Sequence, residues 1–196
     1  RDRIGNTTPK FQGGFGLSGQ WKNFDFTANF NYMVDFDVYN ATNYMLSSSI
    51  SNTNNFYNVL ADFTQKNRWT YVRADGECLY KNTNIDGSVN EYITMNAGKS
   101  LWNPADVEDK VTHSYFVEDG SFLRLQDVTI GYTLPSNLTK KWGMSKVRFY
   151  ASASNLFILT GYSGYDPEVD VQSGLTPSMD YNRYPRSRSF VFGTNI

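Results

Sequence analysis

Residues 23–37 alternate apolar and polar side chains almost without a break, and no other feature of the chain constrains the fold as much. The apolar set is Phe24, Phe26, Ala28, Phe30, Tyr32, Val34 and Phe36, and the polar set is Asp25, Thr27, Asn29, Asn31, Asp35 and Asp37, with Met33 as the exception. Successive side chains of a β-strand point to opposite faces, so the segment predicts a strand with one apolar and one polar face. A helix would mix the two sets around its circumference. The segment is longer than most globular strands and long enough to cross a bilayer, which takes about 9–11 tilted residues.

Four other segments show the same alternation and predict further strands. They lie at 11–21, 121–134, 146–160 and 186–196. Trp21, Lys22 and Asn23 leave room only for a tight turn between the first strand and the strand described above. In the segment that begins at residue 121, Leu123 and Leu125 have the opposite parity to the apolar residues that follow them, which predicts a β-bulge or an end to the lipid-facing stretch.

The connections between these strands alternate between short and long. Residues 136–145 form a short turn, in which Ser136 is expected to cap one helical turn and Gly143 to end it. The long connections are 38–120 and 161–185. In bacterial membrane barrels the short turns face the periplasm and the longer loops face the outside. The alternation therefore predicts two extracellular loops and a periplasmic carboxy-terminus.

The composition suits a membrane barrel. Aromatic residues reach 16% and charged residues only 19%, as expected of strands with one apolar and one wetted face. The net charge of −1, with no basic cluster, gives no reason to expect a nucleic-acid partner. No run of 18 apolar residues is present, so a transmembrane helix is not predicted, whereas a barrel needs no such run. The chain begins in mid-pattern without a leader, which suggests a section of a longer protein. The predicted fold class is all-β, a transmembrane antiparallel barrel with long extracellular loops.

No motif in the chain predicts catalysis, a metal site or a cofactor. His113 is the single histidine, lacks metal-ligand spacing, and has no Gly-x-Ser-x-Gly turn to serve, so a structural role in a loop is favoured. The acidic residues at 166–170 lack the spacing of a calcium-binding loop, so a turn at Asp166 and Pro167 is favoured over Ca²⁺. The glycines at 13–16 lack the helix and lysine of a phosphate-binding loop. The chain is predicted not to be an enzyme.

Aromatic and acidic residues near the long loops are the candidate contacts to a substrate or a partner. They are Tyr39, Tyr44, Trp69, Tyr71, Trp102, Asp35 and Asp37. The aromatic side chains could stack on sugars or on a partner protein, and packing within the loop is the alternative. The two carboxylates could contact a polar ligand, and a role as wetted residues of the lumen or rim is the alternative.

Short motifs spread along the strands resemble the late barrel of the SusC/RagA-type TonB-dependent transporters. In the first two strands they are Ile-Gly-Asn-Thr-Thr-Pro-Lys-Phe at 4–11, Gly-Gly-Phe at 13–15 and Trp-Lys-Asn-Phe-Asp at 21–25. In the second half they are Glu-Asp-Gly-Ser-Phe-Leu-Arg-Leu at 118–125, Gly-Tyr-Thr-Leu-Pro at 131–135, Ser-Asn-Leu-Phe at 154–157, Gly-Tyr-Asp-Pro-Glu at 164–168, Tyr-Pro-Arg at 184–186 and Phe-Val-Phe-Gly at 190–193. Their order and their spacing relative to the strands both match, and residues 38–117 resemble the family only loosely.

The resemblance implies a barrel of about 22 strands closed by a plug, of which residues 1–196 would supply roughly the last five. It also implies active import of a large nutrient, an oligosaccharide or a peptide, across a Gram-negative outer membrane. The implied partners are a SusD-like surface lipoprotein that lids the pore, TonB acting through a part that precedes this chain, and outer-membrane lipid. Even-numbered residues of 24–36 are expected to face lipid and odd-numbered residues the lumen.

Three other functions stay open at this point. A passive porin or another outer-membrane barrel would share the strand pattern but lack a plug. A soluble sugar-binding β-sandwich would bury the apolar face against a second sheet. A barrel enzyme such as a lipase would depend on His113.

Overall fold

A computed structural model describes residues 3–47, 58–63, 67, 70–72, 78–79, 93–95, 101–102, 114–169 and 177–196. The chain divides into two compact units, which are described separately. The sheet unit comprises Arg1–Tyr39 and Val117–Ile196, and the inserted unit comprises Asn40–Phe116.

The sheet unit is built from long strands with short elements at their ends. In chain order it contains β1 (Phe11–Trp21), β2 (Phe24–Val34), β3 (Asp37–Asn40), β7 (Val117–Asp119), β8 (Phe122–Thr133), α2 (Ser136–Thr139), the 3-10 helix η3 (Lys140–Trp142), β9 (Arg148–Thr160), β10 (Met179–Asp180) and β11 (Ser189–Asn195). The bounds of the five long strands differ from the predicted ones by at most three residues.

The inserted unit contains short elements. They are α1 (Ala41–Met45), η1 (Ala61–Phe63), β4 (Thr70–Val72), β5 (Cys78–Leu79), β6 (Ile93–Met95) and η2 (Ser114–Phe116). The strands β5, β4 and β6 pair in that order as an antiparallel sheet. Among the described residues, no helix is long and apolar enough to cross a membrane.

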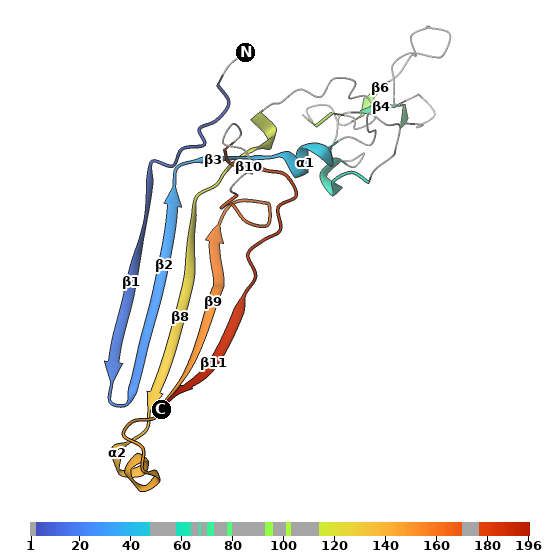
Figure 1. The fold of residues 1–196 in the computed structure, drawn as a ribbon. Helices are drawn as coiled ribbons and strands as arrows, with labels where there is room; N and C mark the ends of the chain where they lie inside the picture. Colours follow the sequence, from blue (N-terminus) through green and yellow to red (C-terminus); the bar gives the residue numbers. More distant parts are fainter. Residues whose placement is uncertain are drawn as a thin grey trace. The chain divides into compact units, whose positions relative to one another are not determined.

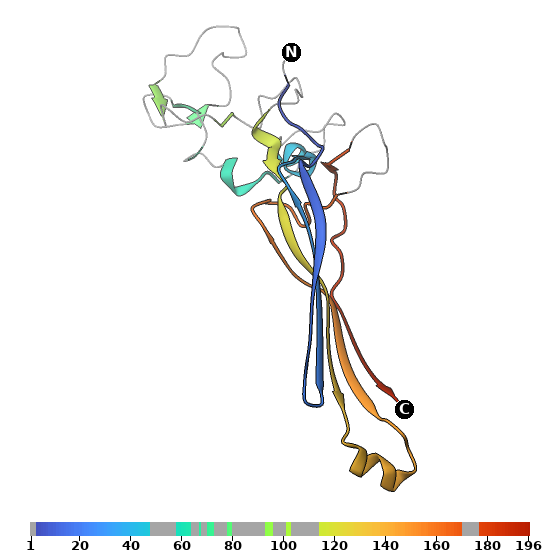
Figure 2. The same cartoon turned by 90° about the vertical axis from the view of Figure 1, so that its left-hand side faces the viewer.

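Five long strands form one antiparallel sheet in the order β1-β2-β8-β9-β11. They lie side by side in Figure 1, and Figure 2 shows the same strands edge-on as a single twisted layer. The β1–β2 turn and α2 lie at one end, called the turn end. The segments 35–40, 117–121 and 161–169 lie at the other, called the loop end. At about 3.4 Å per residue, an 11-residue strand spans about 37 Å.

At the turn end, the connections are as short as the sequence predicts. Trp21 pairs directly with Phe24, so only two residues form the turn, and Lys22 takes the left-handed backbone conformation with φ of 52°. Gly143 ends the α2–η3 segment with φ of 70°. The expected capping by Ser136 is wrong: Ser136 is the first residue of α2, and Pro135 occupies the N-cap position without a side-chain bond.

A bulge interrupts β8, as the parity change predicts. Leu125 pairs with Phe30, and Asp127 pairs with the adjacent Asn29, so Gln126 is the extra residue against β2. The register with β9 shifts at the same place, where Asn155 adopts φ of 53°. Because of the bulge, apolar residues on both sides of Gln126 share one face of the sheet.

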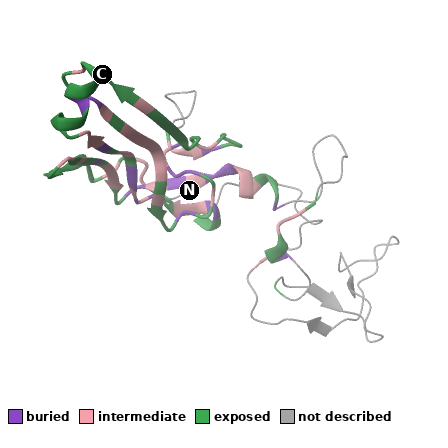
Figure 3. Cartoon of the chain, turned by 90° about the horizontal axis from the view of Figure 1, so that it is seen from below, coloured by how far each residue is buried: buried purple, intermediate pink, exposed green. Residues whose placement is uncertain are grey.

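The register puts most of the apolar side chains on one face of the sheet, called the apolar face. Its large members are Phe11, Phe15, Leu17, Trp21, Phe24, Phe26, Phe30, Tyr32, Val34, Leu123, Leu125, Val128, Ile130, Tyr132, Phe149, Phe157, Leu159, Phe190 and Phe192. Many of them are exposed, including Trp21 at 68% and Phe192 at 79%. Exposed and half-buried residues dominate the strands in Figure 3. The chain therefore presents a broad apolar surface along the length of its strands.

The predicted strand at 23–37 is too long at its carboxyl end. β2 stops at Val34, because Asp35 adopts φ of 62°, which an extended strand cannot contain. The change of direction also moves Phe36 away from the lipid-facing set in which its even number placed it. Phe36 is 5% exposed and belongs to the core.

The core lies at the loop end, on the face opposite the apolar face. It consists of Phe36, Val38, Phe122, Tyr162 and Val169, with Met33 and Ile158 packed against it. Phe122 and Met33 are register partners and have the parity of the polar residues of their strands. Val38 of this cluster lies in β3, the middle strand of the short sheet β10-β3-β7. The segment 161–169 thus folds back over the polar face of the sheet.

Candidate functional site

The polar face of the sheet carries hydrogen bonds between neighbouring strands. The hydroxyls of Thr129 and Ser152 lie 2.8 Å apart, and the Ser154 hydroxyl donates to Asp127 Oδ1 at 2.8 Å. These pairs sit directly opposite each other in the β8–β9 register. A face of this chemistry suits a wetted or protein-filled interior.

At the loop end of this face, Arg124 is buried in an ion pair. Arg124 is 4% exposed, and its Nη2 donates to Asp166 Oδ1 at 2.6 Å and lies 3.4 Å from Glu168 Oε2. Asp166 also accepts the Glu168 N–H at 3.0 Å. A buried cation needs such partners, since an unpaired one is costly to desolvate. The pair ties the segment 161–169 to β8.

The acidic segment extends this network to the start of β11. The other carboxylate oxygen of Glu168 accepts from Arg186 Nη2 at 2.7 Å. Asp166 and Glu168 therefore bind arginines, which accords with the preference for a structural turn over calcium. Within the described part of the chain, no group of three or more His, Cys, Asp or Glu side chains is placed to hold a metal ion. Asp170 lies outside the described residues.

Tyr162 anchors the same segment from its other side. Its hydroxyl donates to Asp180 Oδ2 at 2.7 Å, and the ring belongs to the core cluster. Burial raises the pKa of Tyr162 well above its ordinary value, and the Asp180 carboxylate raises this pKa further. The hydroxyl is thus a hydrogen-bond donor throughout the neutral range. It links the strand β10 to the segment that follows β9.

At the turn end, the polar face carries a second, more exposed ion pair. Arg148 binds both carboxylate oxygens of Asp25 across β8. The residue between them is Gly131, which pairs with both Asp25 and Tyr150 in the register. A Cβ at Gly131 would overlap the Arg148 guanidinium and the Asp25 carboxylate. Because Gly131 has no side chain, the ion pair has room to cross β8.

A cavity of about 390 Å³ opens at the loop end next to the core. Its walls combine Met33, Phe36 and Val169 with the charged side chains Glu168 and Arg186. These walls are about equally polar and apolar, so they suit a ligand that carries both kinds of group. This cavity and the Arg124 network beside it form the candidate functional site.

The structure brings the predicted residues Asp35 and Asp37 to the margin of this site, in structural roles. Asp35 forms an ion pair with Lys10, and its N–H donates to Ser121 Oγ at 2.9 Å. Asp37 Oδ2 accepts the Asn6 N–H at 2.6 Å. Both carboxylates hold the chain entering β1 or leaving β2.

The predicted aromatic contacts separate between the two units. Tyr39 is half-buried in β3, where its N–H donates to the Ser178 carbonyl at 2.9 Å. In the inserted unit, Trp102 packs edge-on against Phe63 with ring centroids 5.0 Å apart, and against Phe116 at 5.7 Å. Tyr44 meets the same Phe116 at 5.5 Å, and burial raises the pKa of Tyr44.

Trp102 and Tyr44 therefore both contact Phe116, and their predicted contact with a substrate or a partner stays a prediction. Tyr71 lies in β4, of which only the backbone is described. Trp69 and His113 lie outside the described residues.

Sequence reasoning did not single out Arg124, Tyr162 or the Asp25–Arg148 pair. Arg124 had a visible signal: it is a cation within a predicted membrane strand, where a charge requires a partner. Its partner Asp166 is 42 residues away, and nothing local in the sequence specifies that pairing.

Comparisons with known proteins agree with this geometry. No protein-family model matches the chain. TonB-dependent receptor P3 of Formosa agariphila is 32% identical over 202 residues, covering 100% of this chain and 17% of the receptor. TonB-dependent receptor SusC of Bacteroides thetaiotaomicron is 40% identical over 84 residues, covering 42% of this chain and 8% of the receptor. A solved structure of the RagAB peptide transporter matches 96% of this chain and 17% of its own with a TM-score of 0.64, at 23% identity, which shows a shared fold.

The open sheet, with its apolar and polar faces, is a section of the wall of an antiparallel β-barrel, so the predicted fold class is confirmed. The chain is a segment of the SusC/RagA-type TonB-dependent receptors, and the predicted resemblance is confirmed. It spans 17% of the length of each of the first two relatives. The relatives are named as receptors and as a transporter, which fits the prediction that the chain is not an enzyme.

Proposed function

We propose that this chain forms part of the wall of a TonB-dependent importer in a Gram-negative outer membrane. The observation that carries the proposal is the apolar face, which runs along strands of 11 to 13 residues while the opposite face is polar. This arrangement matches a strand that meets lipid on one side and a filled lumen on the other. The sequence relatives named TonB-dependent receptors support active import rather than passive diffusion.

In this proposal the loop end is extracellular, and the turn end and the carboxy-terminus are periplasmic. The imported nutrient is large, an oligosaccharide or a peptide, and a SusD-like lipoprotein covers the pore on the outside. The likeness to SusC and to the RagAB peptide transporter supports these choices. The loop-end cavity and the loops at 38–120 and 161–185 would meet the nutrient or the lid.

The need for energy supplied through TonB distinguishes active import from passive diffusion through a porin. Binding a nutrient outside and releasing it inside requires a change of conformation that a ligand alone cannot drive, because a ligand only shifts populations. Uptake through the full-length parent protein should therefore stop when TonB is deleted. Uptake that continues unchanged without TonB would contradict the proposal and favour a porin.

The proposed orientation can be tested on intact cells with two single-cysteine variants of the full-length parent, in a background where Cys78 is serine. Tyr165→Cys, at an exposed loop-end position, should react with a membrane-impermeant maleimide in intact cells. Lys141→Cys, in η3 at the turn end, should react only after the outer membrane is permeabilised. The reverse pattern would overturn the orientation without affecting the assignment to a barrel wall.

A soluble sugar-binding sandwich is the remaining non-membrane alternative. It requires a second sheet over the apolar face, yet Ile130 is 53% exposed and Phe190 61% exposed on that face. Extraction of the parent protein from membranes by salt, without detergent, would favour this alternative.

A further inference from the structure

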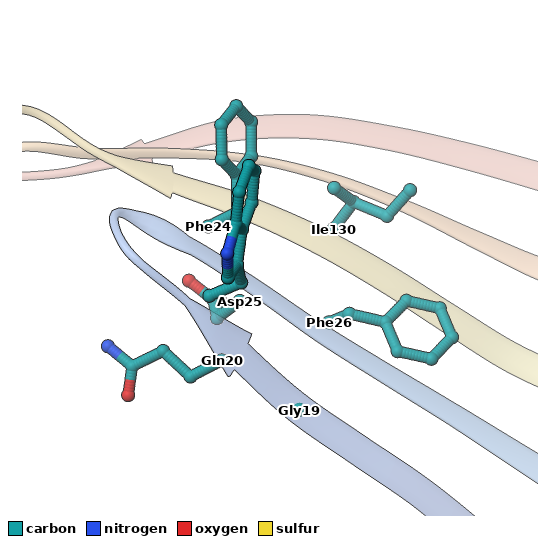
Figure 4. Close-up of a pocket in the computed structure, with 7 residues that line it drawn as sticks. Gly19, Gln20, Phe24, Asp25, Phe26 and Ile130 are labelled. Atoms are coloured by element: carbon teal, nitrogen blue, oxygen red, sulfur yellow. The ribbon is translucent and has the colours of Figure 1, made fainter.

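The apolar face contains a notch close to the turn end. It has a volume of about 360 Å³ and is lined by Gly19, Gln20 and Trp21 of β1, Phe24, Asp25 and Phe26 of β2, and Ile130 of β8. Figure 4 shows Phe26 between Ile130 and the position of Gly19, which contributes no side chain to the wall. A Cβ placed on Gly19 would meet no atom within 4 Å. The absent side chain therefore leaves the space unfilled.

A lysine directly follows the lining residue Trp21, in a strained turn. Lys22 adopts φ of 52°, a conformation that favours glycine or asparagine over lysine. Its ammonium lies over the Trp21 ring, 4.8 Å from the centroid, and Trp21 also lines the notch. A strained residue at a surface turn suggests that its side chain serves a purpose there.

The turn end as a whole is cationic. Residues 20–26 and 131–148 contain Lys22, Lys140, Lys141, Lys146 and Arg148 against the single acid Asp25. Asp25 is also part of the lining of the notch, where the ion pair with Arg148 balances its charge. The exposed indoles of Trp21 and Trp142 lie in the same two segments, as in the aromatic belts at membrane interfaces.

We propose that the notch holds an acyl chain of an anionic glycerophospholipid whose phosphate pairs with Lys22. Lys22 is three positions after Gly19, about 10 Å along a strand, which places the notch just inside the headgroup level that Lys22 marks. The apolar walls suit methylene groups, and the net positive charge suits the phosphate. The proposal rests on the proposed function, because it requires this face to meet the periplasmic leaflet.

The test measures lipid retained by the full-length parent protein, using native mass spectrometry with phosphatidylglycerol as the probe. Gly19→Leu fills the notch and should weaken binding of one lipid about tenfold, since burial of each methylene contributes to acyl-chain affinity. Lys22→Gln should weaken binding of the same lipid about fivefold, and Lys22→Arg should restore it. Gly161→Leu is the matched control, because Gly161 is also surrounded by open space but lies at the loop end.

Equal retention by the parent protein and Gly19→Leu would overturn the proposal, as would an unchanged affinity in Lys22→Gln. Retention of lipopolysaccharide in place of phosphatidylglycerol would overturn the periplasmic assignment of the lipid. A dimer that Gly19→Leu dissociates would overturn it in favour of a second copy on this face. Failure of the unmodified parent to fold into vesicles would instead contradict the proposed function, before any variant is compared. Heat-modifiable migration on gels shows that each variant is folded.

Discussion

The polar and apolar faces of the five-stranded sheet come from alternate residues of the same strands, yet they are stabilised differently. On the polar face, charges and hydroxyls find partners within the chain, as Arg124 does with Asp166 and Thr129 with Ser152. On the apolar face, aromatic side chains such as Trp21 and Phe192 remain exposed. A soluble sheet would show the reverse, with its polar side chains bonded to water and its apolar side chains packed.

This difference indicates that different interactions stabilise the two faces. The polar face is organised by specific pairs, so a single substitution there should have a large effect that depends on the partner. The apolar face is organised by its surroundings, so a substitution there should depend on depth in the bilayer and on polarity. Substitutions matched across the two faces can test this.

The largest effect is expected on the polar face at Arg124. Arg124→Met in the parent protein leaves Asp166 buried without its cation, whereas Glu168 keeps Arg186, and breaking a buried pair costs about 3–5 kcal/mol. A urea titration in lipid vesicles measures the loss, and hydrogen exchange should rise across 162–169. Adding Asp166→Asn removes the orphaned charge and should recover part of the stability. A neutral effect of Arg124→Met would show that the ion pair does not hold this segment.

A substitution on the apolar face should have the next largest effect. Phe30 stacks on Phe15, with ring centroids 4.8 Å apart, near the middle of β2. Phe30→Arg should reduce the free energy of folding into bilayers by about 2–4 kcal/mol, the effect of a cation at the midplane. Its neighbour Asn29 is on the polar face, so Asn29→Arg should reduce it much less. Equal losses in a lipid-folding titration would refute the assignment of the faces.

The sequence predicted the strands and the turn end because their signals are local. Alternation identifies a strand from adjacent residues, and the turn between Trp21 and Phe24 is too short for another arrangement. Gly143 ended the α2–η3 segment as predicted, since a left-handed residue is the usual end of a helix. The capping role of Ser136 failed because Pro135 pre-empts that position.

The loop end could not be predicted because its contacts are distant in the sequence. The pair of Arg124 with Asp166 and the hydrogen bond of Tyr162 to Asp180 depend on how the segments after β9 fold back. The predicted placement of Phe36 on the lipid-facing side was wrong. That prediction used only the even number of the residue, which does not show that the positive φ of Asp35 ends the strand. Alternation predicts a face only as far as the strand continues.

Substituting one glycine on each face tests the same comparison, with smaller expected effects on stability. Gly131→Ala puts a Cβ against the Arg148 guanidinium and the Asp25 carboxylate, and such overpacking costs about 1–3 kcal/mol. Gly19→Ala on the apolar face meets open space and should leave the urea midpoint almost unchanged. The loss at Gly131 should shrink when Arg148→Ala is added, because one of the two obstructing side chains is gone and the Asp25 carboxylate is no longer held in place by the ion pair. A loss at Gly131 that is independent of Arg148 would point to a backbone effect.

The smallest effect should come from Tyr162, and it should depend on pH. Tyr162→Phe removes the hydrogen bond to Asp180 and should cost about 1 kcal/mol at neutral pH. Because folding raises the pKa of this phenol, its contribution is fully present below the unfolded-state value of about 10 and is lost as the pH rises toward the higher folded-state value. The difference between the parent protein and Tyr162→Phe in urea titrations should therefore shrink above about pH 10. Tyr165→Phe, at a position 78% exposed in the same segment, is the control for the loss of a tyrosine hydroxyl. A stability difference between the parent protein and Tyr162→Phe that stays constant or widens with rising pH would show that the hydroxyl is not held by Asp180. The paired groups of the polar face would then extend only as far as the Arg124 ion pair.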